Sequence, residues 1–135
     1  MYLIDTNIFL EVLLGQENSD ECRDLLNAVA DGQIHAAVSK FTVHGIEGML
    51  TDEPEALDRF ITNISSIINL EILETTVQEE KQVLEVARNT EMDFDDALQY
   101  TVAGRENIDE IISYDTDLDD TDLKRTEPSE LADRR

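Results

Sequence analysis

Cysteine, tryptophan and lysine are scarce in this chain, which has one, none and three of them among 135 residues. Because a disulfide needs two cysteines, the lone Cys22 excludes an internal disulfide framework and favours a reducing compartment. No apolar run approaches the ~20 residues of a membrane-spanning helix, and the first residues lack the basic flank of a signal peptide. We therefore expect a cytoplasmic protein that does not contact a membrane.

Basic residues are also few, since 10 Lys and Arg face 32 Asp and Glu and the formal net charge is -22. Self-repulsion at this density strains a compact state in dilute buffer. In molar salt the Debye length shrinks to about 3 Å, and the repulsion is screened. The composition is therefore typical of a protein from a halophile. An acidic interaction protein and a nucleic-acid mimic remain alternatives.

Leu, Ile, Val and Phe make up 39 of the residues, or 29%, well above the roughly 20% below which a highly charged chain stays disordered. The apolar periodicity alternates between short strands and amphipathic helices, which predicts a single α/β domain. The expected strands are 2–4, 34–38, 70–73 and 108–114, with a short edge strand near Leu123. The expected helices cover 8–14, 18–30, 41–50, 54–68, 76–87 and 94–103.

Several residues mark where helices begin. Asn18, Ser39, Thr76 and Asp93 are predicted to cap the helices that follow them, and Glu79 completes a capping box with Thr76. In the helix over 41–50, the apolar stripe is expected to contain Phe41, Ile46, Met49 and Leu50. We place the domain at residues 1–127 and expect residues 128–135 to form a frayed, acidic and basic tail.

Acidic residues directly after strands carry the most functional weight, because ligands of open parallel sheets bind outside the carboxyl ends of the strands. Asp5 follows the first strand and Asp115 follows the last strongly apolar one. Either residue alone is also consistent with a helix cap or a turn. Together they predict a shared acidic site.

Two helical carboxylates extend this pattern. Glu47 is isolated among apolar neighbours, where a carboxylate must face either water or a cation. Asp96 lies in the first turn of its helix, where negative charge is also favoured by the helix dipole. His44 stands three residues before Glu47, so a transition-metal pair is a further alternative.

The order of these motifs resembles the PIN-domain nucleases. The matching motifs are Asp5-Thr6-Asn7 after the first strand, a helical Glu47, Asp96-Ala97 opening a late helix, and Ser113-Tyr114-Asp115-Thr116-Asp117 after the last strand. The resemblance implies a three-layer α/β/α fold around a central, mainly parallel sheet of four to five strands. It also implies an endoribonuclease dependent on Mg²⁺ or Mn²⁺, with Asp5, Glu47, Asp96 and Asp115 as catalytic metal ligands. Asp117 is expected as an auxiliary ligand, and Thr6, Asn7 and Thr116 as residues that hold the ligands by hydrogen bonds.

Within that family a compact free-standing domain resembles the VapC toxins, which implies an RNA substrate, a homodimer and a small antitoxin partner. A housekeeping RNA-processing nuclease and a catalytically idle PIN-fold binding module remain open, the latter because basic residues are few. A phosphoacceptor receiver domain is ranked last, because Thr6 and Asn7 stand where that fold has a second acid. A phosphatase of the Asp-x-Asp type fails at Asn7 for the same reason.

Overall fold

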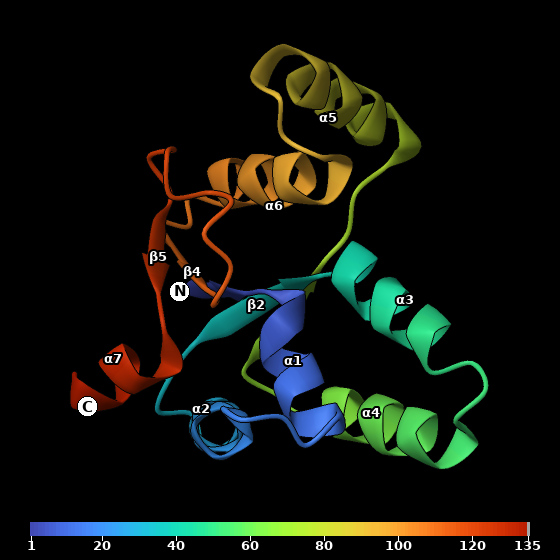
Figure 1. Ribbon diagram of the computed structural model, residues 1–135, viewed down its shortest axis with the longest axis vertical. Helices are drawn as coiled ribbons and strands as arrows, with labels where there is room; N and C mark the ends of the chain where they lie inside the picture. Colours follow the sequence, from blue (N-terminus) through green and yellow to red (C-terminus); the bar gives the residue numbers. More distant parts are fainter. Residues whose placement is uncertain (135) are drawn as a thin grey trace.

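A computed structural model describes residues 1–134 and contains a five-stranded parallel sheet (Figure 1). The strand order is β3-β2-β1-β4-β5, and every neighbouring pair is parallel. The strands are β1 (Tyr2–Ile4), β2 (Ala36–Ser39), β3 (Leu70–Leu73), β4 (Glu110–Ile112) and β5 (Lys124–Thr126). The predicted α/β class, the parallel sheet and the short edge strand are confirmed.

Helices cover both faces of the sheet, as the alternation of its side chains requires. Leu3 and Ile111 point to one face, while Ile4 and Ile112 point to the other. The first face packs against α5 (Val77–Thr90) and α6 (Phe94–Arg105). The second packs against α1 (Thr6–Leu13), α2 (Ser19–Ala30), α3 (Lys40–Met49), α4 (Pro54–Ser66) and α7 (Pro128–Asp133). This is the expected three-layer arrangement.

Most of the predicted helix caps are present. Ser39 Oγ accepts the N–H of Thr42 at 3.1 Å, and Asp93 Oδ1 accepts the N–H of Asp96 at 2.8 Å. Thr76 forms the expected reciprocal capping box at the start of α5. Asn18 is the exception, because its side chain makes no capping bond and its own N–H donates to Glu11 instead.

The buried face of α3 differs from the prediction. Val43, Ile46 and Leu50 are buried at helical spacing, whereas Phe41 and Met49 are exposed. This rotation also buries Thr42 beneath the carboxyl end of the sheet. Amphipathic spacing alone allowed either stripe, and packing against the rest of the core selected this one.

Residues 128–133 form a helix rather than the expected frayed tail, and residue 135, the last of that expected tail, lies outside the described residues. This helix is α7, whose Leu131 is buried against α2. Arg134 also donates to Glu110 Oε2 at 2.9 Å. Two buried side chains, Pro128 and Leu131, and one ion pair therefore anchor a segment whose composition predicted a tail. No helix within residues 1–134 combines the length and hydrophobicity needed to cross a bilayer.

Candidate functional site

The candidate site lies at the switch point of the sheet, which is the place where the order of the strands reverses. The chain passes from β1 through β2 to β3, then returns to place β4 on the other side of β1. Parallel sheets bind ligands at the carboxyl side of such a point. Asp5 follows β1 there, and its N–H donates to the carbonyl of Ile112 at the end of β4. The residues that follow β4, Ser113 and Asp115, are thus brought beside Asp5.

The Asp5 carboxylate is held by several donors. Ser113 Oγ donates to Oδ2 at 2.7 Å, and the Thr6 N–H donates to Oδ1 at 2.8 Å. Asn7 Nδ2 lies 3.2 Å from Oδ2, and Gln99 Nε2 lies 3.4 Å from Oδ1. Burial raises the pKa of Asp5; the Ser113 and Thr6 bonds oppose this rise, and the charge of Asp115 adds to it. The net pKa lies above the usual value for Asp.

Asn7 connects the two loops that carry the acidic residues. Its Nδ2 donates to Ser113 Oγ at 2.9 Å, and its Oδ1 accepts the N–H of Tyr114 at 3.2 Å. Ser113 Oγ in turn accepts the N–H of Asp115 at 3.0 Å. Thr6 bonds to Thr42 at 3.2 Å. Asn7 and Thr6 thus hold together the carboxyl ends of β1 and β4 and the start of α3. Thr116, in contrast, is an exposed loop residue.

The first turn of α6 brings two further carboxylates to this edge of the sheet. Burial, followed by the charges of Asp5, Asp93 and Asp115, raises the pKa of Asp95 to about 6. Asp95 Oδ1 is buried without a hydrogen-bond partner. Burial, followed by the charges of Asp93 and Asp117, raises the pKa of Asp96 to about 7. The charges of these residues therefore act on one another. We call Asp5, Asp93, Asp95, Asp96, Asp115 and Asp117 the acidic cluster.

Part of this acidic cluster has the geometry of a cation site. Asp93, Asp96 and Asp117 each offer an oxygen, and these oxygens lie within 4.8 Å of one another. The same residues line a hollow of about 620 Å³. Carboxylate oxygens are the ligands that Mg²⁺ and Mn²⁺ prefer. The donor set of Asp93, Asp96 and Asp117 therefore fits a hard divalent cation.

Glu47 is placed apart from these contacts. Its Oε1 lies 2.9 Å from His44 Nδ1, and no contact found among residues 1–134 joins it to Asp5, Asp96 or Asp115. At about 100° per residue, Glu47 is roughly 140° around the helix from Thr42. Thr42, rather than Glu47, links α3 to the acidic cluster, because Gln99 Nε2 donates to its Oγ1 at 3.0 Å.

Comparison with protein families settles what kind of domain this is. The sequence profile of the PIN domain matches residues 2–124, which is most of the chain. The chain belongs to the PIN domain family. No curated protein matches this PIN domain in sequence.

Solved structures show the same fold at low sequence identity. A toxin-antitoxin complex from Klebsiella pneumoniae aligns with a TM-score of 0.71 at 18% identity, covering 95% of this chain and 98% of that one. VapC20 of Mycobacterium tuberculosis, described as a Sarcin-Ricin loop cleaving toxin, aligns at 0.70 with 17% identity, covering 88% and 93%. VapBC2 of Rickettsia felis, bound to a promoter DNA fragment, aligns at 0.66 with 14% identity, covering 93% and 97%.

Sequence reasoning missed several residues at the acidic edge of this PIN domain. Asp93 was predicted only as a helix cap and Asp95 was not singled out, although the run Asp-Phe-Asp-Asp places three acids within one turn. Gln99 carried a usable signal, because it is a polar residue between the buried Leu98 and Val102 and one turn after Asp95. Its amide bridges Asp5 and Thr42, and its Oε1 has no hydrogen-bond partner.

Proposed function

We propose that this PIN domain is a metal-dependent endoribonuclease. The observation that carries the proposal is the acidic cluster of Asp5, Asp93, Asp95, Asp96, Asp115 and Asp117 at the switch point of the sheet. Burial and mutual repulsion raise the pKa of Asp5, Asp95 and Asp96. Such a cluster destabilises the empty domain and is relieved by a cation, which is the expected signature of a functional site.

The proposed cofactor is Mg²⁺ or Mn²⁺, with Asp5, Asp96 and Asp115 as ligands and Asp117 as an auxiliary ligand. Asp93 joins this set because it shares the three-residue cluster with Asp96 and Asp117. The ligand role of Glu47 stays a prediction. A divalent ion bound here supplies Lewis acidity for activating water and for stabilising the leaving oxygen of a phosphodiester.

The chain's own residues orient the carboxylates. Ser113 and the Thr6 N–H fix both oxygens of Asp5, and Gln99 ties that carboxylate to Thr42 on α3. Asn7 fixes the loop from which Asp115 projects, through its bonds to Ser113 and Tyr114. Because fixed ligands lose little freedom on binding, this network favours tight and well-oriented cation capture.

We further propose a VapC-like toxin that works as a homodimer in the cytoplasm with a small antitoxin partner. The fold likeness to a toxin-antitoxin complex and to a VapBC complex supports this. A housekeeping RNA-processing nuclease is the alternative with the same chemistry. An idle binding module is the other, favoured by the few basic residues.

The decisive experiment measures RNA cleavage in 2 M KCl with Mn²⁺ for the wild type, Asp5→Asn and Asp96→Asn. Both substitutions delete charge with almost no change in shape. We expect each to lower the cleavage rate by more than the ~10–100-fold typical of groups that only orient ligands. Asp24→Asn, an exposed acid on α2, is the matched control and should cleave normally.

A thermal shift with and without Mn²⁺ accompanies the cleavage assay. The ion should stabilise the wild type and Asp24→Asn more than the two site variants. Wild-type cleavage rates in both variants would show that the proposed nuclease site is wrong. A wild type with neither cleavage nor a metal-induced shift would establish the idle module.

A further inference from the structure

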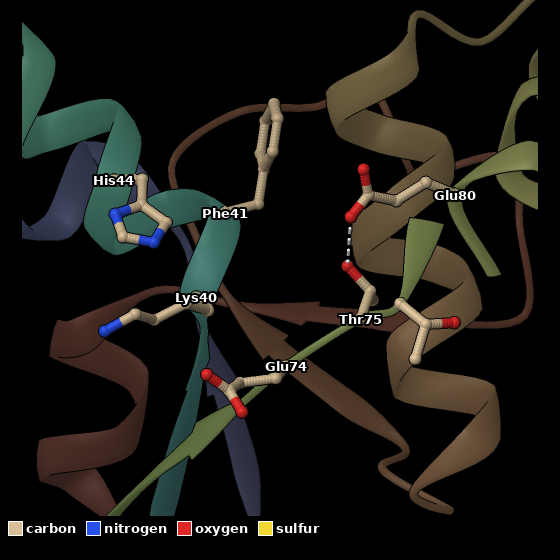
Figure 2. Close-up of a pocket in the computed structure, with 7 residues that line it drawn as sticks. Lys40, Phe41, His44, Glu74, Thr75 and Glu80 are labelled. Carbon is tan, nitrogen blue, oxygen red and sulfur yellow. Dashed lines mark hydrogen bonds between the residues drawn. The ribbon is translucent and has the colours of Figure 1, made fainter. Parts of the chain in front are cut away.

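A second cavity, of about 520 Å³, lies between the start of α3 and the segment joining β3 to α5 (Figure 2). The site residues described above do not line it. Its walls differ in chemistry. The α3 side contributes the aromatic ring of Phe41, and the opposite side contributes the polar side chains of Thr75 and Glu80. The cavity is large enough for a flat heterocycle and combines an aromatic surface with two carboxylates, Glu74 and Glu80.

The aromatic wall is open to a ligand. Phe41 is 42% exposed, so part of its ring is accessible to a ligand. One side of its ring packs against Phe94 with the ring centroids 5.6 Å apart. Phe94 opens α6 directly before Asp95, so the cavity adjoins the acidic cluster. Aromatic side chains such as Phe41 stack with the bases of single-stranded nucleic acids. A nucleic-acid strand with one base on Phe41 would also pass close to the acidic cluster.

The opposite wall presents hydrogen-bond acceptors. Thr75 Oγ1 donates to Glu80 Oε2 at 2.9 Å, which fixes the carboxylate (Figure 2). Within the described residues no cation forms an ion pair with Glu80, so its other oxygen is available to a ligand. A carboxylate offers two acceptors side by side and therefore selects a partner with two adjacent donors.

We propose that this cavity binds an unpaired guanine of the RNA, stacked on Phe41 and hydrogen-bonded to Glu80, an inference that rests on the proposed ribonuclease function. Guanine is the one RNA base whose Watson–Crick edge carries two adjacent donors, N1–H and the N2 amino group. Adenine, cytosine and uracil each place an acceptor next to their donor, and that acceptor would face the carboxylate. Lys40 lines the same cavity and supplies a positive charge for the flanking phosphate.

The direct test measures binding of uncharged nucleosides to the intact protein in 2 M KCl without metal, by NMR titration. We expect guanosine to bind about tenfold more tightly than adenosine. A bidentate contact to a base edge discriminates against the wrong base by about this factor. Inosine keeps N1–H but lacks the 2-amino group, so its affinity should fall between the two. Equal affinity for guanosine and adenosine would overturn the proposal.

Three variants in the cavity and two control variants outside it locate the binding site. Glu80→Gln should remove the guanosine preference, and Phe41→Ala should weaken nucleoside binding about tenfold through lost stacking. Phe41→Trp should preserve binding, because it keeps an aromatic face. Met49→Ala on α3 and Glu85→Gln on α5 are exposed controls outside the cavity and should bind as the wild type does. Circular dichroism confirms that each variant is folded.

Cleavage separates this inference from the proposed function. RNA oligonucleotides that differ by guanine or adenine at one position are cut with Mn²⁺, and the guanine preference should disappear in Glu80→Gln. A wild type that binds guanosine selectively but cuts no RNA would support the cavity and refute the nuclease. A wild type that cuts RNA without any guanine preference in binding or cleavage would refute the cavity and leave the nuclease intact.

Discussion

Ser113 Oγ donates to Asp5 Oδ2 at 2.7 Å and so joins the ends of two neighbouring parallel strands that lie 108 residues apart in the chain. The same hydroxyl oxygen accepts hydrogen bonds from Asn7 Nδ2 and from the N–H of Asp115. A single buried serine therefore sets the relative positions of two acidic residues. Its removal should disturb the acidic cluster without removing a charge.

Ser113→Ala tests this role. We expect a loss of about 1–3 kcal/mol in the free energy of unfolding, because partly buried donors at Asn7 and Asp115 lose their acceptor. The pKa of Asp5 should rise further, since a bond that lowers it is absent. Urea unfolding measures the first effect and NMR titration of the carboxyl carbon the second. Ser129→Ala, at an exposed position on α7, is the control and should change neither.

The stability of the metal-free protein should fall as the pH rises from about 4 to about 7. Asp95 and Asp96 have folded-state pKa values of about 6 and about 7, against 3.8 for the free side chain. Between these limits the folded state binds more protons than the unfolded state, so raising the pH favours unfolding. Melting temperatures in 2 M KCl with a chelator, between pH 5 and pH 8, measure the slope.

Asp95→Asn is the matched control for this pH dependence. Its amide cannot ionise, so the slope between pH 5 and pH 8 should be shallower than in the wild type. A saturating concentration of Mn²⁺ should also flatten the slope, because the ion favours the ionised carboxylates. A wild-type stability that rises across this pH range would contradict the interpretation of the acidic cluster.

Stability should also rise with monovalent salt. With a net charge of -22 on 135 residues, the acidic side chains repel one another and destabilise the compact state. Salt screens this repulsion. We expect the melting temperature to increase steadily from 0.1 M to 2 M KCl, as in a halophile's protein. A flat or falling melting temperature over this range would count against that origin. The same melting temperatures measured in sodium chloride distinguish charge screening, which both salts provide, from a specific effect of potassium.

Leu131→Ala tests whether α7 is part of the folded domain. Leu131 is 2% exposed against α2, so its truncation should cost about 2–5 kcal/mol of unfolding free energy. Ser129→Ala, on the exposed side of the same helix, should cost little. Chemical denaturation measures both variants. An unchanged stability in Leu131→Ala would mean that the C-terminal segment contributes nothing to the fold.

Local signals in the sequence predicted most elements because their causes are local. Strands such as Leu70–Leu73 follow from apolar runs, and the caps at Ser39, Thr76 and Asp93 follow from side chains bonding three residues ahead. The helix α7 was missed because only two of its side chains, Pro128 and Leu131, are buried. That burial depends on α2, about a hundred residues earlier, and leaves no periodic pattern in a short segment.

The acidic site was predicted in part for a similar reason. Asp5 and Asp115 follow strands, so the sheet fixes their position whatever the helices do. The surroundings of Glu47 and Asp95 instead depend on how α3 and α6 are rotated about their axes. Packing of residues such as Val43 and Leu98 sets that rotation, and a single sequence does not display it. The position of Thr42 at the acidic edge became visible only once the rotation of α3 was known.

The order of the strands also governs when the acidic edge comes into existence during protein synthesis. Asp5 leaves the ribosome well before β4, Ser113 and Asp117, since Ser113 follows it 108 residues later in the chain. Until they emerge, β1 has no neighbour on one side and Asp5 has no Ser113 to hold it. A nascent chain therefore carries an incomplete cluster until the segment after β4 has been made, and the assembled edge first forms once that segment has emerged.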